Sequence, residues 1–165
     1  MTIIHYRNKS TNRDENTLRK YILMQTFLPY KDFDDSMQSL DNLRLGKQRV
    51  EALQIIKAIY IPDYGWKNHP AVKMWVDYPD ALQMYHDSAI NEWVRRGKNN
   101  NMPLTRVITD KLPHWLGDEI FHASHRSNLL RKDHVYYGKH NWKEPDNLPY
   151  YWNGYSKQDE VNYAY

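Results

Sequence analysis

Apolar residues recur along most of this chain at the three- and four-residue spacing of helices, and no stretch alternates as a half-buried strand would. Pro70 and Pro79 stand at predicted first helical positions, and Gly97 follows a predicted helix end. Residues 25–30 are predicted to be extended, because Pro29 disfavours helix at Leu28. The predicted helices are residues 36–60, 70–77, 79–96, 103–112 and 118–131. The sequence therefore predicts an all-α fold.

The chain divides into three segments by composition. Residues 1–23 are polar at first and show no apolar period, so they are interpreted as an N-terminal extension. Residues 24–152 are long enough for a single compact helical domain. The final 25 or so residues are rich in Pro, Asn, Gly and Tyr and are predicted to be irregular, and residues 153–165 form an acidic tail.

One predicted helix carries a carboxylate in the middle of a cationic face. At about 100° per residue, a single polar arc collects Asp41, Arg44, Lys47, Gln48, Glu51 and Gln54. The apolar residues on its flanks, expected in the core, are Leu40, Leu43, Val50 and Leu53 on one side and Leu45, Ala52 and Ile56 on the other. A carboxylate ringed by cations suits an anionic substrate whose chemistry needs an acid or a base. The alternative is a surface helix with one weak ion pair between Lys47 and Glu51, worth a few tenths of a kcal/mol.

Charge and composition narrow the class of protein. The net charge of the 165 residues is only +3, but residues 91–143 hold ten basic and five acidic residues, a net charge of +5. A basic segment followed by an acidic tail fits a phosphate-binding surface and also many ordinary enzymes. The absence of cysteine excludes disulfides and cysteine-ligated zinc. We find no apolar stretch of membrane-spanning length and no secretory leader, so a cytoplasmic location is expected.

Five segments together resemble the pyrimidine-dimer DNA glycosylase family, and the likeness is greatest to its small bacterial and phage branch. They are residues 24–30 (MQTFLPY), 40–53 with RLGKQRVEAL at 44–53, 65–75 (GWKNHPAVKMW), 92–97 (EWVRRG) and 124–133 (SHRSNLLRKD). Residues 135–139 (VYYGK) are similar to a terminal aromatic element of the phage enzyme. The resemblance implies an α-helical, single-domain enzyme that binds duplex DNA, flips out a base and cleaves the glycosidic bond of a damaged pyrimidine.

The resemblance also implies roles for individual residues. The essential acid/base carboxylate carries over onto Glu51, while Arg44, Lys47 and Gln48 would contact phosphate or sugar. A carboxylate stabilises the positive charge that develops at C1′ and can move a proton. We expect the neighbouring cations to keep Glu51 ionised. The aromatic residues available to stack on an extruded base are Trp66, Trp75, Tyr136 and Tyr137.

The sequence leaves three candidates for the nucleophile: an N-terminal amine, the Lys47 amine and water. In the phage enzyme of this family, the resemblance implies attack by the N-terminal amine, which forms a Schiff base with the sugar. Thr2 would supply that amine if Met1 is removed, but only if the extension folds back toward Glu51. A chain starting at Met24 would place Gln25 second. Lys47, one helical turn before Glu51, is another candidate amine, and water would make a monofunctional glycosylase.

Further DNA contacts are predicted outside this helix. Asn68 and His69 precede a helix start, where backbone amides bind phosphate well; the alternative is a simple helix cap. The remaining predicted DNA-binding residues are His125, Arg126, Arg131 and Lys132. His122 and His125 have a spacing that could share a metal, but neither a metal nor another cofactor is expected.

The leading functional hypothesis is a DNA-repair glycosylase, with or without AP-lyase activity, acting on a damaged or modified pyrimidine such as a pyrimidine dimer. Its partner would be duplex DNA, with no membrane or protein partner, and the enzyme would be a monomer in the nucleoid or in a phage-infected cell. Two alternatives remain: a related enzyme acting on another modified base or nucleotide, and a non-catalytic DNA-binding module. The central Glu51 carboxylate argues against the non-catalytic module, because a negative charge does not help a protein that only binds phosphate.

Overall fold

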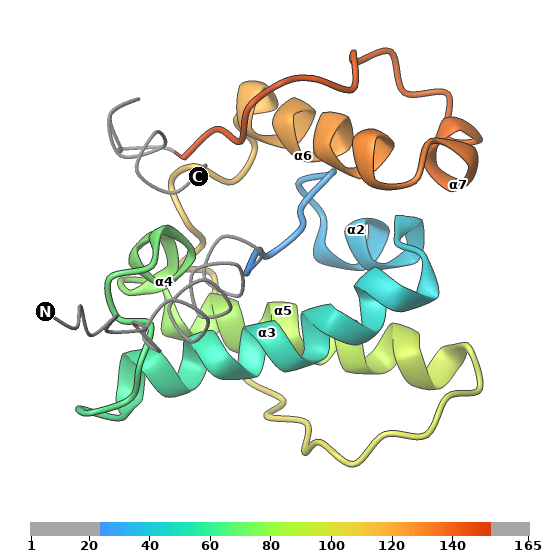
Figure 1. Cartoon of the computed structure of the whole chain (residues 1–165). Coiled ribbons are helices and arrows are strands. Elements are labelled where there is room, and N and C mark those ends of the chain that lie inside the picture. Colours follow the sequence, from blue (N-terminus) through green and yellow to red (C-terminus); the bar gives the residue numbers. More distant parts are fainter. Residues whose placement is uncertain (1–23, 153–165) are drawn as a thin grey trace, which may run out of the picture. The chain divides into compact units, whose positions relative to one another are not determined.

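A computed structural model describes residues 24–152 of the chain, and within them the regular structure is entirely helical (Figure 1). Residues 25–152 fall in one compact unit of the chain. The helices are α2 (Phe33–Ser39), α3 (Asn42–Tyr60), α4 (Pro70–Trp75), α5 (Pro79–Arg95), α6 (Glu119–Lys132) and α7 (His134–Gly138). The predicted all-α class is confirmed, and the ends of α4, α5 and α6 lie within two residues of their predicted positions. None of these helices has the length and apolar character needed to cross a bilayer.

The predicted helix at 36–60 is in fact two helices, separated at Leu40 and Asp41. Both residues have extended backbone angles, and the Asp41 side chain caps α3 by accepting a hydrogen bond from the Arg44 amide at 3.1 Å. Aspartate is among the best N-cap residues, so it ends the first helical segment and starts the second. Leu40 is fully buried at the junction. The break lets α2 and α3 both pack against α5.

The inward face of α3 is rotated relative to the predicted one. Leu45, Ala52 and Ile55 are fully buried against α5, as expected of an apolar helical stripe. By contrast, Leu43 is 62% exposed and Val50 is 43% exposed, so the expectation that these two residues join the core is wrong. The buried stripe also contains a polar residue, Gln48, which belongs to the site described below.

The predicted helix at 103–112 does not form, and these residues are extended or irregular. The buried carboxylate of Asp87 on α5 accepts hydrogen bonds from the amides of Thr105 and Arg106 at 2.9 and 2.7 Å. Arg106 takes a left-handed conformation with φ of 56°. Two amides that a helix would direct along its axis are instead directed at one side chain, so this tertiary contact overrides the local preference.

Helix α6 holds two irregular segments through an unusually polar buried surface. His122, His125 and Arg126 bind the backbone of residues 28–29. Another set, Ser124, Ser127 and Asn128, binds the backbone of residues 145–151. Buried polar side chains are stable only when hydrogen-bonded, and here the two irregular segments supply the partners. As a result, residues 25–30 run between α6 and α3 (Figure 1).

Candidate active site

Glu51 lies near the middle of α3, half-buried, with its carboxylate turned toward the extended segment at 25–30. Its Oε2 accepts a hydrogen bond from the backbone amide of Gln25 and another from the side-chain amide of Gln48, both at 3.3 Å. The predicted catalytic carboxylate is therefore held by two donors from different parts of the chain. Of the predicted catalytic residues, Glu51 and Lys47 belong to α3, and Thr2 lies outside the described residues.

Gln48 fixes the position of Glu51 from the interior of the protein. Its side chain is fully buried, and its Oε1 accepts hydrogen bonds from the Phe27 amide at 3.0 Å and from the Tyr85 hydroxyl at 2.6 Å. With the acceptor end occupied in this way, the Nε2 group points at Glu51. Burial, together with the Glu51 charge, raises the pKa of Tyr85 well above its ordinary value, so this hydroxyl stays a neutral donor.

Burial decides the protonation state of Glu51. Loss of solvation raises the pKa of this carboxyl from 4.5 to about 7, against the opposing effects of the Gln25 amide, the charges of Lys47 and Lys132, and the Gln48 amide. The expectation that neighbouring cations keep the group ionised is therefore wrong, because desolvation outweighs them. Near neutral pH, both forms of the carboxyl are populated, as a group that both accepts and donates a proton requires.

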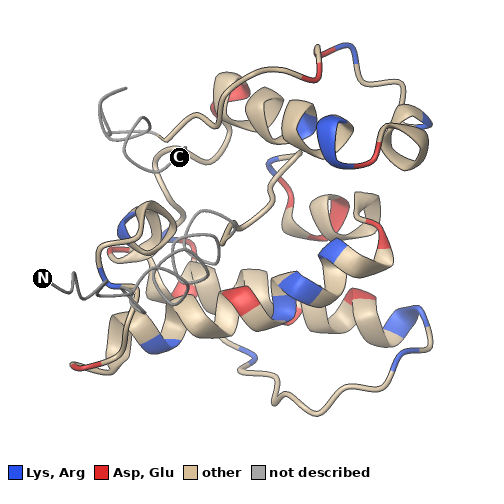
Figure 2. Ribbon diagram, viewed as in Figure 1, with Lys and Arg blue, Asp and Glu red and all other residues tan. Residues whose placement is uncertain are grey.

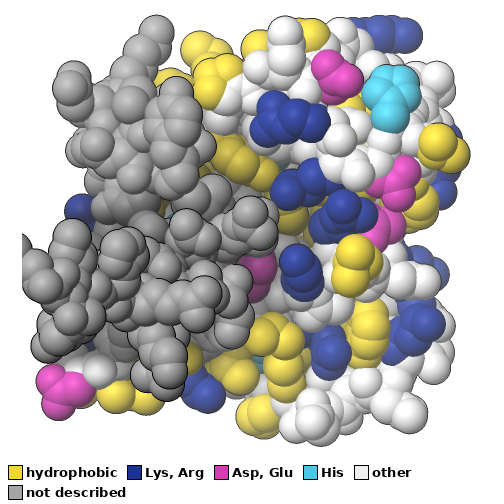
Figure 3. Space-filling view, in the orientation of Figure 1, with side chains coloured by type: hydrophobic (Ala, Val, Ile, Leu, Met, Phe, Trp, Pro, Cys, Tyr) yellow, Lys and Arg dark blue, Asp and Glu magenta, His cyan; other side chains and the backbone are white. Residues whose placement is uncertain are grey.

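Cations from two helices lie near this carboxyl. Lys47 of α3 and Lys132 of the last turn of α6 act on it electrostatically, and Arg44 of α3 and Arg131 of α6 act on Lys132. Figure 2 shows basic residues on α3 and at the α7-proximal end of α6, and in Figure 3 basic side chains gather between these helices on the face shown. Burial, together with the charges of Arg44, Lys47 and Arg131, lowers the pKa of Lys132. The fold thus brings together residues that are about 80 positions apart in the sequence.

Asp41 ties this cationic face to α7. Its carboxylate pairs with the Arg44 guanidinium at 3.1 Å and accepts a short hydrogen bond from the Tyr137 hydroxyl. The Tyr137 hydroxyl in turn accepts from the Asp41 amide at 3.1 Å. Burial alone would raise the pKa of Asp41, but the hydrogen bonds from Tyr137 and Arg44 and the Arg44 charge hold it below its ordinary value. Arg44 is half-buried and fixed in place by this carboxylate.

The structure places the predicted residues of the 65–75 segment at the start of α4. His69 is buried and caps α4, with Nδ1 accepting a hydrogen bond from the Ala71 amide at 3.0 Å, so the cap that we weighed as an alternative is present. Asn68 is exposed beside it. The His69 ring also contacts the rings of Trp66 and Trp152, at centroid distances of 6.1 and 6.4 Å.

His125 and Arg126 use their polar atoms within the fold. His125 is buried, and its Nδ1 accepts from the Leu28 amide at 2.9 Å. Burial and the nearby charges lower the pKa of His125 to about 3, so the ring is neutral. Arg126 donates to the Pro29 carbonyl at 2.7 Å and pairs with Glu119 and Glu144. Both side chains anchor the extended segment that carries Gln25 to Glu51.

His122 and His125 were considered as a metal site because of their spacing. Within residues 24–152, no cluster of three or more His, Asp or Glu residues could hold a metal ion. Nδ1 of His122 binds the Leu28 carbonyl at 2.8 Å, and its Nε2 accepts from the Gly117 amide at 2.9 Å. Both ring nitrogens of His122 therefore hold backbone groups, and neither is free to bind a metal.

The aromatic residues proposed for base stacking fall into two groups. Trp75 and Tyr137 are fully buried, so the expectation that they stack on an extruded base is wrong. Trp66 and Tyr136 are half-buried, and the Lys139 ammonium lies 3.6 Å from the Tyr136 ring centroid. Two aromatic residues that the sequence analysis did not name, Tyr150 and Trp152, have rings in contact at a centroid distance of 5.9 Å. The sequence shows an aromatic-rich C-terminal segment, but it does not show that this segment returns to α6.

Comparison with known proteins gives one match. Residues 24–106 match the family described as pyrimidine dimer DNA glycosylase, a span that includes Glu51 and covers half of the chain. No curated protein and no solved structure matches significantly. The match supports a DNA-repair glycosylase that acts on DNA.

Proposed function

Because the chain belongs to the pyrimidine dimer DNA glycosylase family, we propose that it cleaves the glycosidic bond of a damaged pyrimidine in duplex DNA, with Glu51 as the acid/base group. The observation that carries this proposal is the Glu51 carboxyl itself. It has a pKa of about 7, two hydrogen-bond donors hold it, and cations of α3 and α6 lie near it. Titratable groups with such strongly perturbed pKa values concentrate at functional sites.

The chemistry needs a group that changes protonation state during turnover. In the proposed route, an amine attacks C1′ and the C1′–N bond breaks, so that the base leaves with the proton that the amine gives up. The C1′–O4′ bond then opens as the protonated Glu51 carboxyl gives its proton to O4′, and a Schiff base remains at C1′. Ionised Glu51 offsets the positive charge that develops at C1′ and then accepts the C2′ proton, so that the 3′ phosphate leaves and the strand is nicked. A carboxyl with a pKa near 7 serves both as proton donor and as proton acceptor at neutral pH.

Four cations are proposed to hold the DNA backbone. Lys47 of α3 and Lys132 of α6 both act on the carboxyl, and Arg44 and Arg131 act on Lys132, so the four can bind phosphates near one nucleotide. Exposed Asn68 remains a proposed DNA contact. The other predicted DNA-binding residues, Gln48, His69, His125 and Arg126, are buried, and we assign them to positioning.

Several amines and water compete as nucleophile. Lys47 and Lys132 both act electrostatically on Glu51, and the lowered pKa of Lys132 increases its neutral, nucleophilic fraction. The Gln25 nitrogen lies 3.3 Å from the carboxylate, but in the intact chain it is an amide and does not attack. A processed chain that begins at Gln25 would place its α-amine there. Thr2 remains a candidate by resemblance.

The test is a borohydride trap. The protein is incubated with UV-irradiated duplex DNA and sodium borohydride, then resolved on a denaturing gel, and the crosslinked peptide is identified by mass spectrometry. We expect a covalent complex that unirradiated duplex does not give, mapped to one amine. Base release without trapping would assign water as the nucleophile. The absence of both base release and a trapped complex would contradict the proposal. That result would favour an enzyme that acts on another modified base or nucleotide, or a non-catalytic module.

A further inference from the structure

The outer face of α3 carries two large apolar side chains that do not join the core. Leu43 is 62% exposed and Val50 is 43% exposed, whereas Leu45 and Ile55 of the same helix are fully buried. At about 100° per residue, Leu43 lies about 40° from Lys47 around the helix axis, and Val50 lies about 60° from it on the same side. We call Leu43, Lys47 and Val50 the outer strip of α3, because all three are exposed along one line of the helix.

Glu51 borders this outer strip. It lies about 40° from Lys47 on the side opposite Leu43, and its position is eight residues, or about 12 Å of helical rise, from that of Leu43. This separation is similar to the width of the grooves of B-DNA, about 6 to 12 Å. One duplex can therefore contact both residues, with a sugar at Glu51 and the base stack at Leu43. At this distance, Leu43 takes no part in the chemistry.

The backbone that carries Leu43 is fixed on both sides. Oδ1 of Asn42 accepts a hydrogen bond from the Arg96 guanidinium of α5 at 3.1 Å. Asp41, the cap of α3, accepts hydrogen bonds from the amide and the guanidinium of Arg44, each at 3.1 Å. The exposure of Leu43 is therefore not the result of a loose helix end, and its side chain projects from a rigid first turn.

The neighbours of these apolar side chains are cationic. Arg44 follows Leu43 directly, and Lys47 lies between Leu43 and Val50 along the outer strip. Figure 3 shows hydrophobic side chains among the basic ones on the face that it displays. A surface that alternates cations with apolar groups is complementary to a partner that carries negative charge beside apolar area. Duplex DNA is such a partner, because its phosphates flank a stack of bases.

Extrusion of a nucleotide leaves a gap in the base stack. The lost stacking and pairing are costly, and the cost is least where the base is already mismatched or unpaired. Proteins that open or kink DNA frequently insert apolar side chains between the base steps, and leucine is one of the residues that they use. An exposed leucine on a rigid, cation-flanked helix turn has the properties that this role requires.

We propose that Leu43 enters the base stack and fills the gap that the extruded nucleotide leaves. This inference rests on the proposed function, because it needs a nucleotide whose sugar lies at Glu51. Leu43 is then a positioning residue that keeps the duplex open while the chemistry proceeds at Glu51. Its contribution is greatest where a paired, stacked nucleotide has to be extruded, and it decreases where the pairing is already lost.

The test compares two duplexes with the same site-specific pyrimidine dimer, one with complementary bases opposite the dimer and one with mismatched bases there. Leu43→Ala should lower kcat/KM for base release from the paired duplex by about 10- to 100-fold, in keeping with the cost of unstacking. On the mismatched duplex, the loss should stay within about threefold, and wild type should cleave this duplex at least as fast as the paired one. Leu43→Met keeps a long apolar side chain and should resemble wild type on both. Val94→Ala, which shortens a 52% exposed side chain on α5, is the matched control and should also resemble wild type.

Five results would overturn the inference. Leu43→Ala with wild-type activity on the paired duplex would remove the role, and equal losses on both duplexes would assign Leu43 to folding or to general DNA contact, which a Tm measurement separates. Wild type that is slower on the mismatched duplex would show that extrusion is not the step being helped. A dimer of the wild-type protein in sedimentation that Leu43→Ala abolishes would assign the outer strip to self-association. Wild type that releases a base from neither duplex would overturn the proposed function as well, a pattern distinct from the other four.

Discussion

The side-chain amide of Gln48 spans the core and the site: its Oε1 accepts from the Tyr85 hydroxyl at 2.6 Å, and its Nε2 donates to Glu51 at 3.3 Å. A fully buried glutamine on the apolar stripe of α3 is costly unless both ends are bonded. Here both are, and the result is a carboxylate whose position is set by the interior rather than by solvent.

Replacing Gln48 by methionine should therefore damage both stability and activity. Gln48→Met has a similar volume but leaves the Phe27 amide without its acceptor and removes one donor to Glu51. We expect a loss of about 2–3 kcal/mol in the free energy of unfolding, measured by urea denaturation. Gln54→Met, on the same helix, serves as the control and should change stability by less than about 1 kcal/mol. Equal, small effects of the two substitutions would contradict the positioning role.

The raised pKa of Glu51 makes its ionised form a cost to the folded state. A carboxyl with a pKa of 4.5 unfolded and about 7 folded stabilises the fold fully below pH 4.5, and this contribution is lost as the pH rises through 7. Glu51→Gln carries no such cost, so its stability relative to wild type should increase between about pH 4.5 and 7. The difference should level off at up to about 3 kcal/mol.

The measurement is urea denaturation of wild type and Glu51→Gln at several pH values. Asp63→Asn, at an exposed turn, is the control and should show no comparable increase. A stability difference that does not change with pH would show that Glu51 titrates in the fold as it does in solvent.

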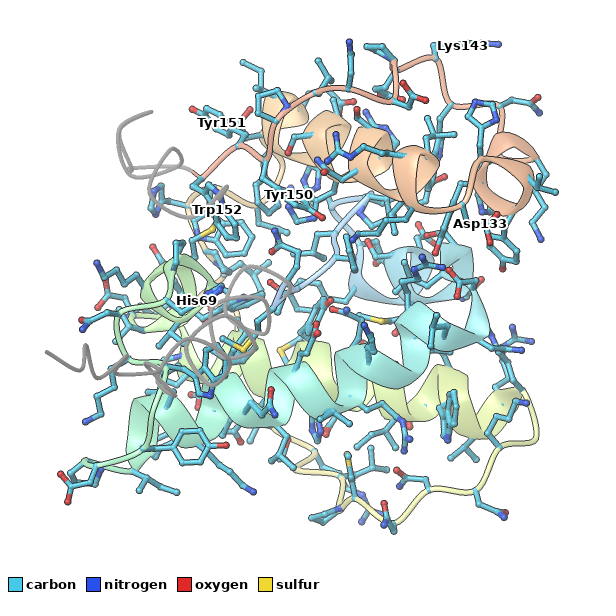
Figure 4. The ribbon with its side chains drawn as sticks, viewed as in Figure 1. His69, Asp133, Lys143, Tyr150, Tyr151 and Trp152 are labelled. Atoms are coloured by element: carbon cyan, nitrogen blue, oxygen red, sulfur yellow. The ribbon has the colours of Figure 1, made fainter. Side chains whose placement is uncertain are left out.

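Activity should depend on the same titration. If ionised Glu51 accepts the C2′ proton, cleavage of abasic duplex should rise with pH and show a limb near pH 7. The charges of Lys47 and Lys132 lower the pKa of Glu51, so Lys47→Met or Lys132→Met should move this limb to higher pH in whichever variant remains active. Lys143→Met, with an exposed lysine in the segment that follows α7 (Figure 4), is the control and should leave the limb in place. An unshifted limb in both active-site variants would refute the assignment of the limb to Glu51.

Arg126 should matter to folding more than to DNA binding. Its buried guanidinium binds the Pro29 carbonyl and pairs with Glu119 and Glu144, of which only Glu144 is largely buried. Arg126→Met should lower the free energy of unfolding by about 2–4 kcal/mol, since it strands a carboxylate and a carbonyl. Arg95→Met removes an exposed partner of a glutamate that Arg96 also binds, and should lower the free energy of unfolding far less than Arg126→Met does. A large loss of DNA affinity in Arg126→Met with unchanged stability would instead assign this side chain to the interface.

The features readable from the sequence are those that local pattern determines. Pro70 and Pro79 mark the starts of α4 and α5, and helical spacing alone places Glu51 and Lys47 on one polar face of α3. The break at Asp41 and the missing helix at 103–112 depend on capping and on a carboxylate 18 residues away, and helical periodicity reports neither.

Long-range relationships account for the remaining differences. His125 and Arg126 carry the polarity of a DNA-binding surface, yet the fold buries them against residues 28–29, 97 positions away. The direction of the Glu51 pKa shift is likewise not readable from the sequence, because the pattern shows which charges are near but not how much water is excluded. Tyr150 contacts His125 only through the return of the C-terminal segment to α6.

The most direct test of the account is the action of wild-type protein and Glu51→Gln on a duplex with one site-specific pyrimidine dimer. We predict that wild type releases the damaged base, and that Glu51→Gln is slower by about 100-fold or more while binding the same duplex with wild-type affinity. Base release by Glu51→Gln at the wild-type rate would contradict the central role assigned to this carboxyl.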